Sequence, residues 1–205
     1  ADYASYHAML ERLWRDRVQG DAARVRLIER LATHMAEEEV LVAPPGFADE
    51  APLALEQLLA GGILRQSGTG IAFAHQTLFD FARARAFAAG GLALDAYVLD
   101  HQTGLFVRPV LWSALSYLRE VNPAEYARVF DTLWSNASLR LHVRVLLAEF
   151  RGQVSNPSPD EIAWFGSIVD DAMIRRPVIV AMLGNNAWFK ALLPTLPTLL
   201  AASYG

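Results

Sequence analysis

The sequence predicts a mainly α protein with one small β-hairpin, and three observations lead to this prediction. The first 90 residues read as helix, short strand, helix, strand, glycine turn and strand, which is the layout of a winged helix-turn-helix module. Beyond residue 91 the pattern is helical only, with two similar helix starts 36 residues apart at Asn122 and Ser158. The composition, 53% hydrophobic and 20% charged, is that of a globular chain. We therefore expect an N-terminal helix (1–20), a winged helix (21–90) and a HEAT- or TPR-like helical-repeat array (91–205).

Charge and composition exclude several classes of function. The net charge of −4 provides no basic field, so neither nucleic acid nor a membrane surface is an expected partner. The chain has no cysteine, which removes disulfides, thiolate zinc sites and cysteine nucleophiles and is compatible with the cytoplasmic location that we expect. No signal segment is visible, and the longest uncharged run, 191–205, is too short for a membrane span and contains two prolines. Because the chain starts without Met, we expect it to be a piece of a longer protein.

The elements before the hairpin follow from capping residues and periodicity. Residues 3–19 have apolar side chains at helical spacing, with Asp2 as the expected N-cap and Gly20 as terminator. Asp21 is expected to cap a second helix that ends near Val40. Residues 40–42 favour a short edge strand, which Pro44, Pro45 and Gly46 cannot continue.

The hairpin lies between two helices. Pro52 suits the first turn of a helix that ends at the Gly61-Gly62 pair. Residues 63–66 and 71–75 are expected to be strands joined by the turn at 67–70. From Gln76 onward an alanine-rich stretch with apolar residues at helical spacing predicts a helix, so a strand runs directly into a helix at His75.

The second half reads as paired helices. Helices are expected at 92–99 and 105–121, and then after Asn122-Pro123 and Ser158-Pro159, each of which is followed by a Glu in the pattern of a capping box. The second helix of each of these last pairs is expected at 139–150 and 178–193, the latter starting near Pro177. Four tryptophans are expected to fill interfaces between stacked helices: Trp112, Trp134, Trp164 and Trp188.

Two stretches resemble a known family. The run Phe-Ala-His-Gln-Thr-Leu-Phe-Asp-Phe-Ala-Arg-Ala-Arg at 73–85 resembles the end of the winged-helix domain in STAND-type NTPases, including NACHT proteins. The preceding Leu-Leu-Ala-Gly-Gly-Ile-Leu at 58–64 looks like the entry to the hairpin in these proteins. The resemblance covers roughly residues 21 to 90, and helical arrays also follow this domain in the family.

The resemblance implies a role in nucleotide sensing. STAND proteins are signalling switches in which an upstream P-loop domain binds ADP or ATP and a winged-helix histidine contacts the phosphate; by position that residue is His75. Asp80 matches the acidic position of the family, and we expect it to pair with Arg83, Arg85 or a backbone amide. The chain has no phosphate-loop motif and its only lysine is Lys190, so we expect no catalysis by this chain alone. It reads as the regulatory and sensor part of a larger ATPase, with a ligand or protein partner on its repeats.

Plainer interpretations stay open. His75 is equally well explained as a core histidine bonded to a carbonyl. The other histidines are single, and no residue spacing indicates a metal site.

A winged helix can bind DNA, but the helix at 52–60 has Glu56 and no Arg or Lys. The chain could also be a stand-alone protein–protein scaffold. The acidic pairs Asp170-Asp171 and Asp95 with Asp100 are read as surface charge, and no serine hydrolase motif is present.

Overall fold

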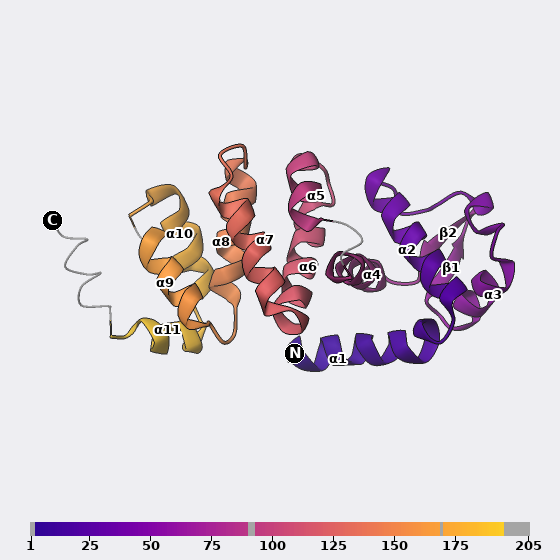
Figure 1. The fold of residues 1–205 in the computed structure, drawn as a ribbon, viewed down its shortest axis with the longest axis horizontal. Coiled ribbons are helices and arrows are strands. Elements are labelled where there is room, and N and C mark those ends of the chain that lie inside the picture. Colours follow the sequence, from indigo (N-terminus) through magenta and orange to yellow (C-terminus); the bar gives the residue numbers. More distant parts are fainter. Residues whose placement is uncertain (1–2, 90–92, 169, 195–205) are drawn as a thin grey trace. The chain divides into compact units, whose positions relative to one another are not determined.

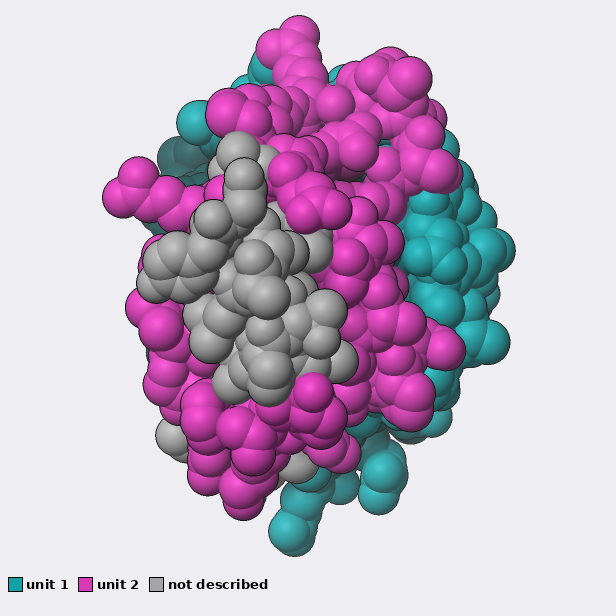
Figure 2. Space-filling view, turned by 90° about the vertical axis from the view of Figure 1, so that its left-hand side faces the viewer, with its two compact units in different colours: residues 1–133 teal, residues 134–205 magenta. Residues whose placement is uncertain are grey.

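The computed structural model describes residues 3–89, 93–168 and 170–194, with only the backbone described for 3–7 and 172. In these ranges the chain forms eleven α-helices and one two-stranded antiparallel sheet, which confirms a mainly α fold with a small β-hairpin (Figure 1). It divides into two compact units, residues 1–133 and 134–205, coloured separately in Figure 2. The region boundaries predicted at residues 20 and 90 both fall within the first unit, so they stay predictions.

The helices and strands have the following bounds. The first unit contains α1 (Tyr3–Trp14), the π-helical segment η1 (Arg15–Gln19), α2 (Ala22–Glu37), the 3-10 turn η2 (Pro45–Ala48), α3 (Pro52–Ala60), β1 (Leu64–Ser67), β2 (Gly70–Phe73), α4 (Gln76–Ala88), α5 (Leu94–Asp100), α6 (Val107–Val121) and most of α7 (Pro123–Ser135). The second unit contains α8 (Leu141–Gln153), α9 (Pro159–Ile168), α10 (Ala172–Met182) and α11 (Asn186–Leu192).

The region predicted to be a winged helix starts with a well-capped helix. The carboxylate of Asp21 accepts hydrogen bonds from the backbone amides of Ala23 (2.7 Å) and Arg24 (3.2 Å), as the sequence predicted. These bonds and the opposing effect of burial leave the pKa of Asp21 lowered. The helix ends at Glu37, slightly before the predicted end, and Glu39 then adopts a positive φ of 53°. The predicted cap of the first helix, Asp2, lies outside the described residues.

The hairpin forms where the sequence placed it. β1 and β2 pair antiparallel, with Leu64 opposite Phe73 and Ser67 opposite Gly70. Gly68 in the turn has a φ of 60°, a conformation that favours glycine. The expected edge strand at 40–42 is instead a single bridge one residue later, between Ala43 and Ile71. Gly70 allows this approach, because a Cβ at residue 70 would lie 2.5 Å from the carbonyl oxygen of Ala43.

α4 occupies the centre of the first unit. It packs mainly against α6 and also contacts α2 and β2. Its buried side chains include Phe79, which is 1% exposed and lies edge-to-face with both Phe73 and Phe106. The alternation of large aromatic and small alanine residues in the sequence therefore makes a helix that is buried over most of its length.

The second unit has its own core around α8 and α10. Trp188 on α11 is fully buried there and its indole nitrogen donates to the carbonyl of Arg151 (3.1 Å). Trp134 and Trp164 pack against this core and lie edge-to-face at 5.0 Å. The tryptophans of the second unit thus fill helix interfaces, as expected. Trp112, in the first unit, is only half-buried.

The predicted helix at 178–193 is wrong. The structure has two helices there, because Gly184 adopts a φ of 83° and the side chain of Asn185 caps a new helix at the amide of Ala187 (3.1 Å). Pro177, expected near a helix start, lies inside α10, where its missing N–H removes one helical hydrogen bond.

The two predicted capping boxes differ in the structure. At Ser158 both bonds form: its amide donates to Glu161 (2.7 Å), and its hydroxyl accepts from the Glu161 amide (3.3 Å). At Asn122 only the cap forms, from the Glu125 amide to Asn122 Oδ1 (3.2 Å). α7 and α9 keep the predicted 36-residue spacing through these starts, whereas their partner helices α8 and α10 do not.

None of the helices within the described ranges has both the length and the apolar character needed to cross a lipid bilayer.

Candidate functional site at the start of α4

The junction between β2 and α4 is a rigid platform for His75. The amide of Ala74 donates to the carbonyl of Ile63 (3.0 Å), which extends the hairpin pairing to the residue before His75. His75 is itself extended, with φ −138° and ψ 145°, and its carbonyl accepts the first helical bond from the Leu78 amide (3.1 Å). Since Phe73 and Phe79 are buried on either side, the position of residue 75 is fixed by core packing.

The side chain of His75 is exposed. Its imidazole forms no capping hydrogen bond with α4, and the next two residues, Gln76 and Thr77, are exposed as well. The alternative of a core histidine bonded to a carbonyl is therefore wrong. The ring is available to a molecule outside this part of the chain.

The local field at this end of α4 favours an anion. The first amides of a helix have no intrahelical acceptor, and the helix dipole is positive at this end. The nearest acidic residue on the helix is Asp80, which accepts a hydrogen bond from Gln76 Nε2 (3.1 Å). Burial raises the pKa of Asp80, partly opposed by this bond. The predicted pairing of Asp80 with Arg83, Arg85 or a backbone amide is wrong, because its hydrogen bond is to the Gln76 side chain.

The two arginines of α4 make other contacts. Arg83 is 1% exposed, and its guanidinium lies 4.9 Å from the ring centres of both Phe87 and Tyr97. None of its nitrogens has a hydrogen-bond acceptor among the described residues. Burial lowers the pKa of Arg83. Arg85 is bonded to Glu11 and Tyr117, which come from α1 and α6.

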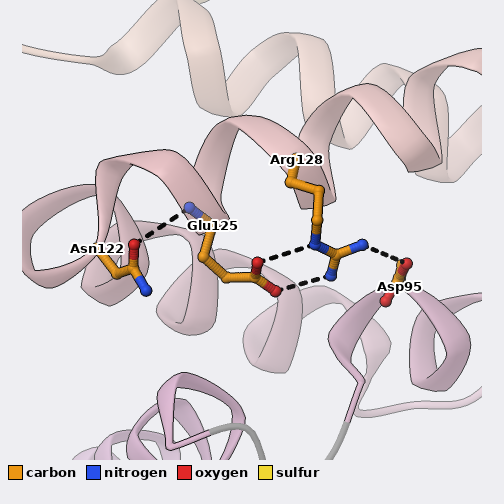
Figure 3. Close-up of polar contacts among 4 residues, drawn as sticks. All are labelled: Asp95, Asn122, Glu125 and Arg128. Atoms are coloured by element: carbon orange, nitrogen blue, oxygen red, sulfur yellow. Dashed lines mark hydrogen bonds and ion pairs between the residues drawn. The ribbon is translucent and has the colours of Figure 1, made fainter.

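The acidic pairs of the sequence serve structural roles. Asp171 caps α10 by accepting from the amides of Met173 and Ile174. Asp95 on α5 accepts from Arg128 on α7 (3.1 Å), and Arg128 also forms a two-bond pair with Glu125 (Figure 3). Burial opposes ionisation of Asp95, but the contacts with Arg128 leave its pKa lowered. The hydrogen bonds from Arg128 also lower the pKa of Glu125. This cluster ties α5 to α7 through Oδ2 of Asp95, whose other oxygen is buried without a hydrogen bond among the described residues.

The remaining histidines have simple explanations. His34 stacks on Phe47 with ring centres 4.9 Å apart, and His101 stacks on Tyr97 at 4.3 Å. The side chain of His7 is outside the described residues. In the parts of the chain that the structure describes, no three His, Asp or Glu side chains gather in a way that could hold a metal. On α3, the helix that reads DNA in many winged helices, the exposed side chains include Leu53 and Glu56.

With this geometry described, the chain can be compared with known proteins. No protein-family model, no curated protein and no solved structure matches it. The resemblance to STAND NTPases therefore stays an expectation drawn from its own residues.

One polar cluster in the first unit was not found from the sequence. Glu11, Arg85 and Tyr117 come together from helices that are far apart in the chain. Each looks like an ordinary surface residue in its own helix, and no local spacing connects positions 74 and 106 residues apart. Only the packing of α1, α4 and α6 brings them into contact.

Proposed function

We propose that the chain is the regulatory and sensor part of a STAND-like signal-transduction ATPase. In this proposal, an upstream domain of the same protein binds ADP or ATP, and His75 contacts the phosphate. The helical repeats bind a ligand or a protein partner. The chain contributes no phosphate-loop lysine and acts as a sensor and not as the catalyst.

The observation that supports the proposal is the exposed imidazole of His75 on a rigid junction. The imidazole stands at the N-terminus of α4, where free helix amides and the helix dipole also favour a phosphate. A charge-assisted hydrogen bond from the ring to phosphate contributes roughly 1.5–3 kcal/mol. A contribution of that size shifts a two-state equilibrium about tenfold to a hundredfold.

The test is nucleotide retention in the whole protein that contains this chain. We expect His75→Ala to release bound ADP faster during gel filtration and to raise basal signalling. His34→Ala is the matched control, because it removes an imidazole from the same module at a position on α2. Equal ADP retention by the His75→Ala variant and the wild type would reject the sensor role, as would a coding sequence that holds no phosphate-loop domain upstream.

A second candidate function is a stand-alone protein–protein scaffold. It is favoured by exposed apolar side chains at α10. Met173 and Val180, seven residues apart on one face of the helix, are 61% and 58% exposed, and Leu183, directly after the helix, is 72% exposed. A start codon directly before residue 1 in the gene, together with no nucleotide binding, would favour this scaffold over the sensor.

A further inference from the structure

α1 is tied to the rest of the first unit by one polar cluster. Glu11 Oε1 accepts hydrogen bonds from Arg85 Nη1 of α4 (2.6 Å) and from the Tyr117 hydroxyl of α6 (2.5 Å). Arg85 Nη1 also donates to the Tyr117 oxygen (3.0 Å). A single carboxylate oxygen therefore joins three helices, and Figure 1 shows α1 running past α6 and α4 on its way to α2.

Among the side chains described on α1, those of residues 8–14, two apolar ones are buried. Trp14 is buried edge-to-face against Phe81, with ring centres 5.9 Å apart, and the guanidinium of Arg85 lies 5.0 Å from the Trp14 ring centre. Leu10 is the other buried side chain among those described on α1, and Met9 is 56% exposed. Within residues 8–14, whose side chains the structure describes, α1 contacts α4 and α6 through a face that contains Leu10, Glu11 and Trp14.

The segment after α1 has the features of a hinge. η1 is π-helical, a wider and rare geometry that occurs mostly as short insertions in α-helices. Its side chains at residues 15–17 are exposed and Val18 alone is buried. Gly20 follows, and Asp21 then starts α2 with its own cap, so the start of α2 is capped without α1. η1 stays attached to α2, because the carbonyl of Arg17 accepts a hydrogen bond from Arg24 Nη1 (2.9 Å).

We propose that α1 is a hinged arm, with η1 as its hinge and the Glu11–Arg85–Tyr117 cluster as the latch that holds it on α4 and α6. The latch charges are partly shielded, with the side chains of Arg85 and Glu11 26% and 27% exposed. Such a contact is stronger than a surface ion pair and still reversible, so its loss shifts the arm toward the open state about tenfold to a hundredfold. Opening uncovers Trp14, Phe81 and Tyr117.

The latch also connects the arm to the helix that carries His75. Arg85 lies ten residues after His75 along α4, about 15 Å at the rise of an α-helix. Opening or closing of the arm therefore acts on α4 and regulates the nucleotide contact. This last step rests on the proposed function, whereas the arm itself does not.

The test measures the arm in the chain of 205 residues without nucleotide. Because the sequence has no cysteine, Met9→Cys and Thr77→Cys allow spin labels to be placed on exposed positions of α1 and α4 alone. We expect one short label distance in the parent and a second, longer population after Glu11→Gln. Amide hydrogen exchange of α1 should then accelerate about tenfold or more, while α2 and α8 exchange as before. Tyr117→Phe, which keeps the ring, should give a smaller opening.

Asp16→Asn is the matched control, because it removes a carboxylate of η1 that forms only an exposed pair with Arg12. It should leave the distance and the exchange unchanged. An unchanged distance distribution after Glu11→Gln would overturn the latch. Faster exchange spread evenly over the whole first unit would also overturn it, since the cluster would then only stabilise the fold. Neither result depends on ADP retention, so the sensor proposal can fail independently.

Discussion

The two ends of α4 differ in almost every respect although they belong to one helix of 13 residues. The N-terminal end presents His75, Gln76 and Thr77 to the outside, with no side-chain cap. In the C-terminal half, Arg83 is buried between two rings and Arg85 is bonded to two other helices. The two arginines of the second half contact other helices or rings inside the unit, whereas at the first half the imidazole of His75 is exposed and the side chain of Gln76 bonds to Asp80 of the same helix.

In α4, the C-terminal half and the buried face stabilise the fold, and the N-terminal end carries the exposed side chains that could contact another molecule. The aromatic core around Phe79 and the contacts of the C-terminal half fix the position and direction of α4. A side chain at the free end then needs no contacts of its own to be held in place. Such an arrangement, with a functional group on a packed element, gives a more defined geometry than a group on a loop.

The largest effect is expected from the core that positions the free end. Phe79→Ala should lower the free energy of unfolding by about 3–5 kcal/mol, because it empties the space between Phe73 and Phe106. Urea denaturation followed by circular dichroism measures this. If Phe79→Ala does not fold, Phe79→Leu, with an expected loss of about 1–2 kcal/mol, gives the same information. A loss below 1 kcal/mol for the alanine variant would show that α4 is held mainly by other contacts.

The next largest effect is expected at the Glu11–Arg85–Tyr117 cluster, which contacts the C-terminal half of α4 through Arg85. Tyr117→Phe should cost about 2 kcal/mol at neutral pH, because it removes a hydroxyl that donates to the Glu11 carboxylate. Burial, and then the hydrogen bond to Glu11, raise the pKa of Tyr117 above its ordinary value of 10.0. The folded state therefore keeps the hydroxyl protonated at a pH where the unfolded chain loses the proton. The contribution of the protonated Tyr117 hydroxyl to the free energy of unfolding is therefore complete below pH 10.0 and is lost as the pH rises above that value.

Stability measured against pH checks this sign. The difference in unfolding free energy between the wild type and Tyr117→Phe should be constant near neutrality and shrink at alkaline pH. A difference that grows with pH would mean that the tyrosinate form is the one stabilised in the folded state.

Short-range sequence patterns predicted most helices and the hairpin. Contacts between residues far apart in the chain could not be predicted from such patterns. Asp21 and Ser158 were recognised as caps because their partners lie two or three residues away. The break at Gly184 was missed because apolar periodicity runs through it and a positive φ leaves no signal beyond the glycine itself. His75 is predicted as a site residue from its motif; the structure shows that it is exposed, and its role stays a prediction. Glu11 and Tyr117 could not be paired without coordinates, since no pattern in the chain brings α1 and α6 together.

A smaller effect, of opposite sign, is expected at Arg83. Its guanidinium is buried with no acceptor in good hydrogen-bonding geometry among the described residues. The rings of Phe87 and Tyr97, with the hydroxyl of Tyr97 and the carboxylate of Glu37 nearby, compensate only part of the loss of hydration. Arg83→Met keeps the apolar length of the side chain and removes the charge, so it should raise the unfolding free energy by roughly 1 kcal/mol. Arg83→Ala should lower it, because it leaves a cavity. A loss of more than 1 kcal/mol on substitution by Met would show that the charge itself is required.

The smallest effect is expected at His75, and its sign is informative. A serine at an N-cap accepts a hydrogen bond from a helix amide that His75 leaves unused, so His75→Ser should stabilise the chain by about 0.5–1 kcal/mol in thermal unfolding. Ser158→Ala, which removes an existing cap from α9, should show a loss of about the same size. A gain in stability on His75→Ser would mean that His75 is not the most stabilising residue at the start of α4. This is expected if the exposed imidazole serves for contact with another molecule. If His75→Ser brings no gain, residue 75 is already optimal for folding, and its exposure no longer indicates a function.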